Sequence, residues 1–518
     1  MDKYLSFKNF KVSYSTIFLF VFLSISFYYN YQQILFLRPV GIHLWRNSVC
    51  ATYAQNYFYG ADFLRPEISC YISDNYTSDV SVAEFPGYYY LIGLIYKFFG
   101  LEEFLFRLVN VIMGYIGLLA LFKLSRLIIK DVFYSFVAPV IIFSATVFAF
   151  YLNNFLIDPV ALSISFIGLY LFYKYVNSKK LKHFVLSMIF FALAGLMKPH
   201  ALIPYFIIGF LFVLDFIFGV KLYNGKRLFN KPWRFILPLI IVLGVVFSWY
   251  LYSKIYSQLH GGVISPVGTR SIFIVSPERR IEIWQQILSR FNSYYYHSPV
   301  FLYLSGGLFI VNLVIIKRFD KLLNFFVVLS FIQVFIFNIL FYFSIGRCDY
   351  YQICNLVFLV FLFLNFMYYL RTNHFGIFKS YYFKGLVIVL LLMLIHEGKK
   401  GMNNRFDDWS YHNTSKNFVY KFGALEPYLR QLGIERNDRV YVTPDPSIDI
   451  SLYLMNQKGN TDFGISGTTN EKIEKLIPKG LQYIIIASDK IYEECDLSPY
   501  TNNKIGEFRG VDIYKVAE

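Results

Sequence analysis

Long apolar runs recur along this chain, and they constrain its fold more than any other feature. A helix that crosses a lipid bilayer needs roughly 20 mostly apolar residues, and about eleven segments meet that requirement. The sequence therefore predicts a mainly α-helical, polytopic transmembrane bundle. The expected spans are residues 13–32, 103–127, 132–151, 157–177, 183–198, 200–220, 234–253, 298–316, 322–344, 351–370 and 382–396.

One further apolar stretch, residues 88–100, is too short to cross a bilayer. We expect it to lie at the membrane interface or to re-enter the membrane from one side.

The charge balance points to a membrane and not to nucleic acid. Charged residues make up 16% of the chain and hydrophobic residues 56%, whereas a soluble globular protein carries about 25% charged residues. The same figures exclude a disordered chain and a small disulfide-stapled fold. The 49 Lys+Arg exceed the 33 Asp+Glu and give a net charge of +16, but in a membrane protein such an excess marks the cytoplasmic loops. We expect no nucleic-acid partner.

Basic residues gather in alternate loops. If residues 88–100 do not cross, these loops all share one side, which predicts a cytoplasmic N-terminus and an extracytoplasmic C-terminus. Heavy use of Lys, Asn, Ile, Phe and Tyr is typical of an AT-rich bacterial genome, so we expect a bacterial cytoplasmic (inner) membrane. The basic residues that lie in these alternate loops are Lys3, Lys8, Lys11, Arg126, Lys130, Lys179, Lys180, Lys182, Lys221, Lys226, Arg227, Lys231, Arg234, Lys317, Arg318, Lys321, Arg371, Lys379 and Lys384.

Three long segments are then extracytoplasmic: residues 33–102, residues 254–297 and the tail from residue 397. The first is acidic, rich in aromatic residues and far longer than a connection requires, which indicates a functional role. The tail alternates helix and strand patterns, so residues 397–518 are expected to form a small α/β domain beside a membrane domain of residues 1–396. Cys50 and Cys70 in the first segment are candidates for a disulfide in an oxidising compartment, and the sequence does not decide the matter.

Two carboxylates lie at the expected outer face of the membrane, where a charge is costly unless it has a function. Glu84 directly precedes the aromatic stretch, where it suits a general base or a metal ligand, or equally an acid that stabilises a helix start. Asp158 comes before Pro159 at the start of an expected span. An Asp-Pro pair is also common at an ordinary helix start, and for this motif alone that interpretation is favoured.

Two cations occupy the same face. Lys198 lies in an outer hairpin, where lysine is disfavoured; it either snorkels to the interface or binds a phosphate. Arg347 precedes Tyr350 and Tyr351 in another outer hairpin. It either pairs locally with Asp349 or, with the tyrosines, binds a lipid-linked phosphate.

The order of these motifs resembles the GT-C superfamily of polytopic glycosyltransferases, and is similar to the lipid A aminoarabinose transferases and the protein O-mannosyltransferases. Those proteins carry a Glu-x-Pro element before an interfacial helix, then a Leu-Asp-Pro element, an outer lysine and a basic-Tyr hairpin. Here the corresponding elements are 84–86, 157–159, Lys198 and 347–351, in the same order. The resemblance covers roughly residues 40–400.

The first outer segment also resembles a bacterial branch of the superfamily with a His-x-Trp-Arg-Gln-x-Asp pattern. His43 and Arg46 match it and are expected to contact the substrate region, but Val49 stands where the branch carries its expected catalytic Asp. Either Glu84 or Asp158 takes over, or Asp62 or Glu67 folds into the site, or the protein is slow or inactive.

The resemblance implies an inverting transfer of a sugar from a polyprenyl-phosphate donor to a glycan, lipid or protein acceptor at the outer face. Glu84 or Asp158 would be catalytic, and Lys198, Arg347, Tyr350 and Tyr351 would bind the donor phosphate. A divalent metal ion (Mg²⁺, Mn²⁺ or Zn²⁺), if one takes part, would be held by Glu84 or Asp158.

Two other interpretations compete with an active enzyme. Val49 allows a catalytically inactive relative that binds lipid-linked sugar. A transporter or flippase of lipid-linked glycans is the second alternative, but it would carry its charges in the middle of the spans. Here the candidate charges gather at one face, which favours the enzyme.

Overall fold

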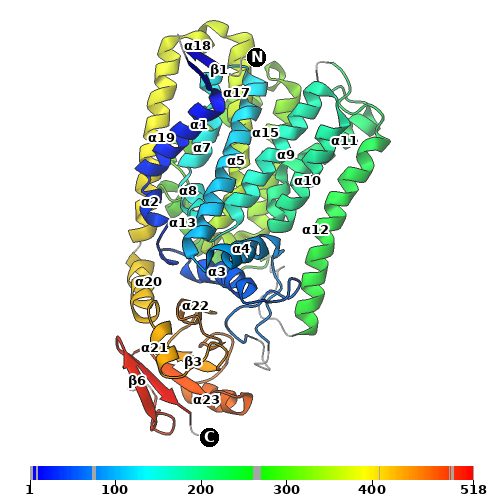
Figure 1. Ribbon diagram of the computed structural model, residues 1–518. Coiled ribbons are helices and arrows are strands. Elements are labelled where there is room, and N and C mark those ends of the chain that lie inside the picture. Colours follow the sequence, from blue (N-terminus) through cyan, green and yellow to red (C-terminus); the bar gives the residue numbers. More distant parts are fainter. Residues whose placement is uncertain are drawn as a thin grey trace.

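The computed structural model describes residues 4–7, 10–72, 78–223, 225–260, 270–407, 409–488, 491 and 495–516. A helical bundle forms the larger part of the molecule, and a smaller domain of helices and strands lies at one end of it, next to the C-terminus (Figure 1). Lys3 and Lys8 lie outside the described residues.

The larger part begins with a short antiparallel hairpin of β1 (Tyr4–Phe7) and β2 (Phe10–Ser13). Its helices are α1 (Tyr14–Tyr28), α2 (Tyr31–Ile34), α3 (Leu44–Phe58), α4 (Gly87–Phe99), α5 (Glu103–Ile129), α6 (Val132–Ser135), α7 (Val137–Ser144), α8 (Thr146–Leu152), α9 (Asp158–Ser178), α10 (Leu181–Met197), η1 (Pro199–Leu202), α11 (Ile203–Phe218), α12 (Trp233–Leu259), α13 (Pro277–Asn292), α14 (Pro299–Val314), η2 (Ile316–Arg318), α15 (Lys321–Leu340), α16 (Tyr342–Arg347), η3 (Asp349–Gln352), η4 (Cys354–Leu356), α17 (Val357–Asn373), α18 (Phe375–Lys379) and α19 (Tyr381–Asp407).

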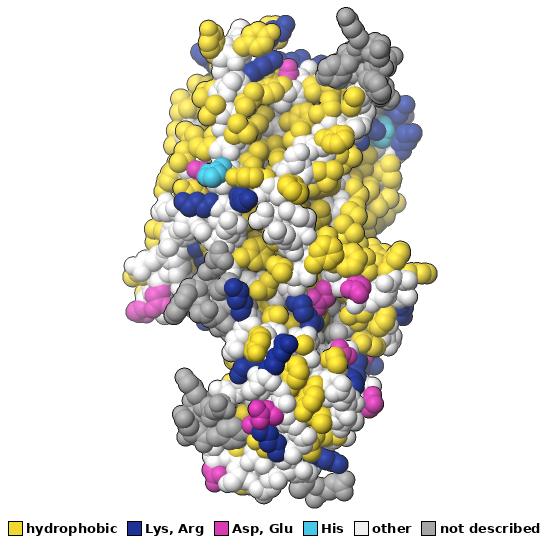
Figure 2. All heavy atoms as spheres, turned by 60° about the vertical axis from the view of Figure 1, so that its left-hand side comes forward, with side chains coloured by type: hydrophobic (Ala, Val, Ile, Leu, Met, Phe, Trp, Pro, Cys, Tyr) yellow, Lys and Arg dark blue, Asp and Glu magenta, His cyan; other side chains and the backbone are white. Residues whose placement is uncertain are grey.

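Each of the eleven apolar segments coincides with helical structure. Within the described residues, seven helical segments are long and apolar enough to cross a membrane, and a bent pair brings the number to up to eight. The helices α1, α10 and α14 are apolar but shorter. Apolar side chains cover most of the bundle surface in one view, with basic side chains at the end farthest from the C-terminal domain (Figure 2).

Two expected spans differ from the structure. Residues 132–151 do not form one straight helix, because Ala145 is extended (φ −65°, ψ 115°) and the helices on either side of it meet at 74°. The span expected at 382–396 is longer than predicted, because α19 runs from Tyr381 to Asp407.

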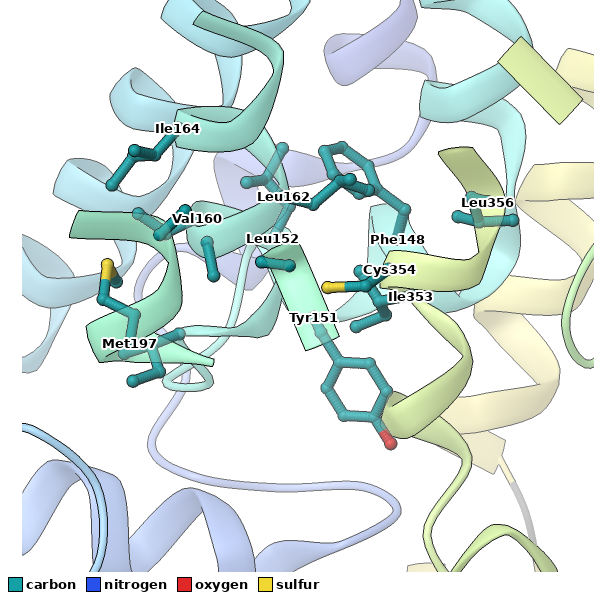
Figure 3. Close-up of a cluster of buried hydrophobic side chains, with 14 of the residues drawn as sticks. Phe148, Tyr151, Leu152, Val160, Leu162, Ile164, Met197, Ile353, Cys354 and Leu356 are labelled. Carbon is teal, nitrogen blue, oxygen red and sulfur yellow. The ribbon is translucent and has the colours of Figure 1, made fainter. Parts of the chain in front are cut away.

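Buried apolar side chains fix the broken helix against its neighbours. Phe148 and Leu152 from α8 pack in one cluster with Val160 and Leu162 from α9 (Figure 3). Residues from α10 and the η3–η4 region complete the cluster, and the Tyr151 ring extends away from it (Figure 3). The starts of α9 and η1 and the η3 turn are thereby held close together.

The first long segment folds across the end of the bundle. There α3 and α4 lie between the bundle and the C-terminal domain (Figure 1). The 13-residue α4 is the stretch expected to be too short to cross a bilayer. A Cβ on Gly93 would come within 2.6 Å of Tyr57 Cβ and 3.1 Å of the Ala54 carbonyl oxygen, so glycine permits the close contact between α4 and α3.

The C-terminal part contains α20 (Trp409–Phe422), α21 (Glu426–Gln431), α22 (Ile450–Leu454), α23 (Thr469–Leu476) and η5 (Ile477–Lys479) around a five-stranded sheet. The strand order is β4-β3-β5-β7-β6, and the first three strands are parallel. The bounds are β3 (Val440–Thr443), β4 (Gly459–Asn460), β5 (Tyr483–Ile486), β6 (Lys504–Phe508) and β7 (Val511–Lys515). The structure therefore contains the partly parallel α/β arrangement expected from the sequence.

The first long segment and the C-terminal domain are joined by hydrogen bonds and ion pairs. The Tyr71 N–H donates to the Gly459 carbonyl oxygen (3.0 Å), and the Gly459 N–H donates to the Ser69 carbonyl oxygen (3.0 Å), so the segment extends the sheet beside β4. Lys458 pairs with Glu67 at 2.6 Å and also with Asp79. The domain is therefore fixed to the segment that carries α3.

All five cysteines lie within the described residues and are unbridged, so Cys50 and Cys70 do not form the disulfide that the sequence left open. The Cys50 Sγ lies 3.3 Å from the Tyr89 hydroxyl, whereas Cys70 packs near Thr461 at the edge of the C-terminal domain. The two cysteine side chains therefore contact different parts of the protein.

Asp449 is a buried carboxylate between α3 and the C-terminal domain. The Ser48 hydroxyl donates to its Oδ1 (3.1 Å) and the Thr52 hydroxyl to its Oδ2 (2.8 Å). Burial raises the pKa of Asp449 to about 7, because these two hydrogen bonds offset only part of the desolvation and Asp445 adds repulsion.

Asp449→Asn should therefore remove a pH dependence from the stability of the protein. The folded protein binds a proton at Asp449 between about pH 4 and 7 that the unfolded chain does not bind, so wild-type stability falls as the pH rises through this range and Asp449 causes no further change above it. We expect the variant to lack this slope and to be more stable than wild type at about pH 8, by about 4 kcal/mol or less. Thermal unfolding in detergent at several pH values measures this. An unchanged slope in the variant would show that Asp449 does not titrate.

Candidate active site

A cavity of about 880 Å³ opens where the first long segment meets the α10–α11 hairpin, α12, α15 and η3. One end of it is polar and the other apolar. The polar end is formed by Arg46, Glu84, Lys198, His200, Tyr350 and Tyr351, and the apolar walls include Leu202, Phe206, Leu243, Val246, Phe247, Phe337 and Phe341.

Glu84 lies at the centre of the polar end. Its Oε1 accepts from both Arg46 and Lys198, and the Tyr89 hydroxyl donates to its Oε2 at 2.7 Å. Its side chain is 14% exposed. Burial by itself would raise the pKa of Glu84, but Arg46 and Lys198 outweigh burial and hold that pKa well below the ordinary value of a glutamate. Glu84 is therefore ionised and weakly basic in this arrangement.

Lys198 connects Glu84 to the second carboxylate. It follows α10 in an extended conformation, where its N–H donates to the Ala194 carbonyl oxygen at 2.8 Å. The Lys198 Nζ lies 3.2 Å from Asp158 Oδ2, and the Asp158 side chain at the start of α9 is fully buried. Two cations, Arg46 and Lys198, thus face two anions, Glu84 and Asp158, and the four charges sum to zero.

A second buried cluster supports the cavity from behind. Asp349 accepts from the Tyr151 hydroxyl at 2.6 Å and pairs with Arg405 at 2.5 Å and with His43 Nε2 at 3.2 Å. His43 lies three residues before Arg46, and Asp349 directly precedes Tyr350. Asp349 therefore ties two walls of the cavity together and joins both to α19.

Comparison with known proteins fits this geometry. Residues 83–252 match the family of dolichyl-phosphate-mannose-protein mannosyltransferases. No curated protein sequence matches the chain. The structure is similar to ArnT from Cupriavidus metallidurans in the apo state, with a TM-score of 0.58 and 11% identity over 97% of this chain and 98% of that one.

Two other solved structures share the arrangement. The apo oligosaccharyltransferase of Archaeoglobus fulgidus gives a TM-score of 0.55 at 11% identity, over 90% of this chain and 69% of that one. The arabinofuranosyltransferase AftD from Mycobacteria gives 0.53 at 11% identity, over 98% of this chain and 40% of that one.

The chain has a GT-C glycosyltransferase fold.

The resemblance predicted from the motifs is thereby confirmed. Within this GT-C fold, Glu84, Lys198, Arg46, Tyr350 and Tyr351 meet at the cavity. Asp158 lies directly behind Lys198, and His43 lies beside Tyr350, with the two rings 5.5 Å apart.

Arg347 is the exception among the candidate residues. It is exposed at the end of α16, its guanidinium lies 4.8 Å from the Phe343 ring centroid, and it does not line the cavity. The alternative of a local ion pair with Asp349 is not found, because Asp349 is buried and pairs with Arg405. The sequence contained no indication of the Asp349–Arg405 pair, because the two residues lie on different elements and are far apart in the chain.

Glu84 is the only carboxylate among the described residues that line the cavity, and Val49, where the resemblance implies an Asp, does not line it. Val49 is buried in α3. Neither first-segment acid takes its place: Asp62 accepts from the Leu64 N–H at 2.9 Å, and Glu67 pairs with Lys458.

The polar end does not fit a metal ion. The described residues contain no group of three or more His, Cys, Asp or Glu side chains able to hold one. The Lys198 ammonium lies between Glu84 and Asp158, so a positive charge already occupies the position that a bridging metal would need.

Asp349→Asn should destabilise the protein strongly, because it leaves Arg405 buried without its counterion. Removing one partner of a buried ion pair costs about 3–5 kcal/mol. The matched control is Arg347→Ala, which removes an exposed charge two residues away and should change stability by less than about 0.5 kcal/mol. Thermal unfolding in detergent compares them, and equal losses in the two variants would contradict the assigned pairing.

Proposed function

We propose that this protein is an inverting membrane glycosyltransferase that moves a sugar from a polyprenyl-phosphate donor to a glycan, lipid or protein acceptor. The observation that carries this proposal is the cavity itself, which joins a carboxylate and two cations to a long apolar wall. A polyprenyl-phosphate sugar has the same division between a charged head and an apolar tail. ArnT has been solved with undecaprenyl phosphate, and the Archaeoglobus fulgidus oligosaccharyltransferase AglB with an inhibitory peptide and a dolichol-phosphate; both share the fold.

The donor lipid is assigned to the apolar wall of the cavity. Phe206 on α11 and Leu243 and Phe247 on α12 line the cavity and are exposed, although each is apolar. Such side chains suit a hydrocarbon environment, so a polyprenyl chain can lie along them while its phosphate reaches Arg46 and Lys198. Tyr350 and Tyr351 flank the phosphate position.

In the transfer step, Glu84 takes the proton from the acceptor hydroxyl as that oxygen bonds to the anomeric carbon. The bond between the anomeric carbon and the phosphate oxygen breaks, and polyprenyl phosphate leaves with the electron pair. Arg46 and Lys198 stabilise the charge that develops on the phosphate. A single displacement of this kind inverts the anomeric centre. Asp158 acts through Lys198, whose ammonium it holds in place.

No step of this mechanism uses a metal ion. The Archaeoglobus oligosaccharyltransferase has been solved with Zn and sulfate. In this chain the ammonium of Lys198 would supply the positive charge between the two carboxylates.

The proposed orientation puts the cavity at the outer face of a bacterial cytoplasmic membrane, with eleven spans, a cytoplasmic N-terminus and an extracytoplasmic C-terminal domain. The N-terminus and the C-terminal domain lie at opposite ends of the bundle (Figure 1). One view shows Lys and Arg side chains at the end of the bundle farthest from the C-terminal domain, and others elsewhere on the same face (Figure 2). Basic residues at that far end support this orientation through the positive-inside rule.

The second candidate is an inactive relative that binds lipid-linked sugar without transferring it. The apolar Val49 at the position of the branch's Asp favours this alternative. Such a protein would bind the donor at Arg46 and Lys198 in the same way, so only an assay of sugar transfer distinguishes the active enzyme from the inactive relative.

Glu84→Gln should reduce sugar transfer from a polyprenyl-phosphate donor by about 10²–10⁴-fold in reconstituted membranes, because the general base is lost. Asp62→Asn is the matched control, since it neutralises an exposed carboxylate of the same segment outside the cavity. Unchanged transfer by the Gln variant would remove Glu84 from catalysis, and no transfer by wild type would favour the inactive relative.

A further inference from the structure

We infer that the Glu84 carboxylate occupies the phosphate position before the donor binds, so that the donor displaces it and thereby makes it an effective base. This inference rests on the proposed function, because it describes how the same cavity changes when its donor enters.

Arg46 and Lys198 are the only Arg and Lys side chains among the described residues that line the cavity. Both point their charge at one oxygen atom, Glu84 Oε1. A donor phosphate needs the same two groups, because they supply the positive charge at this end of the cavity. Glu84 and the phosphate therefore compete for the same hydrogen-bond donors.

Charge balance decides the competition once the donor is bound. Before the donor binds, the positive charges of Arg46 and Lys198 balance the negative charges of Glu84 and Asp158. A phosphodiester adds one negative charge to this buried cluster, and a buried unbalanced charge is costly. Proton uptake by Glu84 restores neutrality, so the bound donor raises the proton affinity of Glu84.

Competition for Arg46 and Lys198 also sets the order in which the two substrates bind. While both cations hold Oε1 and Tyr89 donates to Oε2, the carboxylate is a poor acceptor for the proton of a hydroxyl group. After the phosphate has drawn Arg46 and Lys198 toward itself, Glu84 is released and can take that proton. The donor therefore binds productively before the acceptor, and the acceptor hydroxyl supplies the proton that Glu84 needs.

The test uses undecaprenyl phosphate as the probe with the full-length protein in nanodiscs. Glu84→Gln frees both cations, so it should bind the probe roughly tenfold or more tightly than wild type, and the probe should raise its unfolding temperature further. Asp62→Asn should bind like wild type. Undecaprenol, which lacks the phosphate, should bind all three proteins equally.

Calorimetry at about pH 6, where a Glu84 of raised proton affinity would be partly protonated, in two buffers of different ionisation enthalpy gives an independent measure. Wild type should take up more protons than Glu84→Gln on binding the probe, because Gln cannot titrate and any proton change on the probe's own phosphate is common to the two proteins. If the Gln variant binds no more tightly than wild type, or takes up the same number of protons, the inference is overturned while the donor assignment stands. If wild type does not bind the probe, both fail. Should Glu84→Gln fold poorly, Glu84→Ala is measured in the same way.

Discussion

The ion pairs around Lys198 are the interaction on which the rest of this structure depends. Lys198 lies between Glu84, which comes from the first long segment, and Asp158, which begins α9. A lysine at this depth is stable only with negative charges beside it. The pairing fixes the first segment to the bundle and forms the polar end of the cavity. Arg46, which lies on α3, supplies the second positive charge and pairs with Glu84.

Two buried carboxylates that do not line the cavity, Asp349 and Asp449, hold the elements that carry its polar side chains. Asp349 joins His43, Tyr151 and Arg405, and so connects α3, α8 and α19 to the turn that carries Tyr350. The C-terminal domain contacts the same helix through Asp449, which accepts hydrogen bonds from the Ser48 and Thr52 hydroxyls of α3. Helix α3 is therefore held between two buried carboxylates, and its position sets that of Arg46.

Sequence reasoning predicted the parts of the structure that depend on local pattern. Apolar length located the helices, and the shortness of residues 88–100 predicted a helix that cannot span the membrane. Glu84, Asp158 and Lys198 were chosen because charges at an apolar boundary are costly, and the structure brings all three together. The break at Ala145 was missed because an extended residue in an apolar run leaves no compositional mark. Arg405 was missed because its pairing with Asp349 depends on tertiary packing.

In the proposed mechanism, Arg46 and Lys198 bind the donor phosphate, and Glu84 releases both cations when the phosphate arrives. An experimental structure of the full-length protein with undecaprenyl phosphate tests this most directly. We expect phosphate oxygens within hydrogen-bond distance of Arg46 and Lys198, the polyprenyl chain along Phe206 and Phe247, and Glu84 moved away from Lys198. A phosphate bound elsewhere, or a Glu84 still paired with both cations beside a bound phosphate, would contradict it.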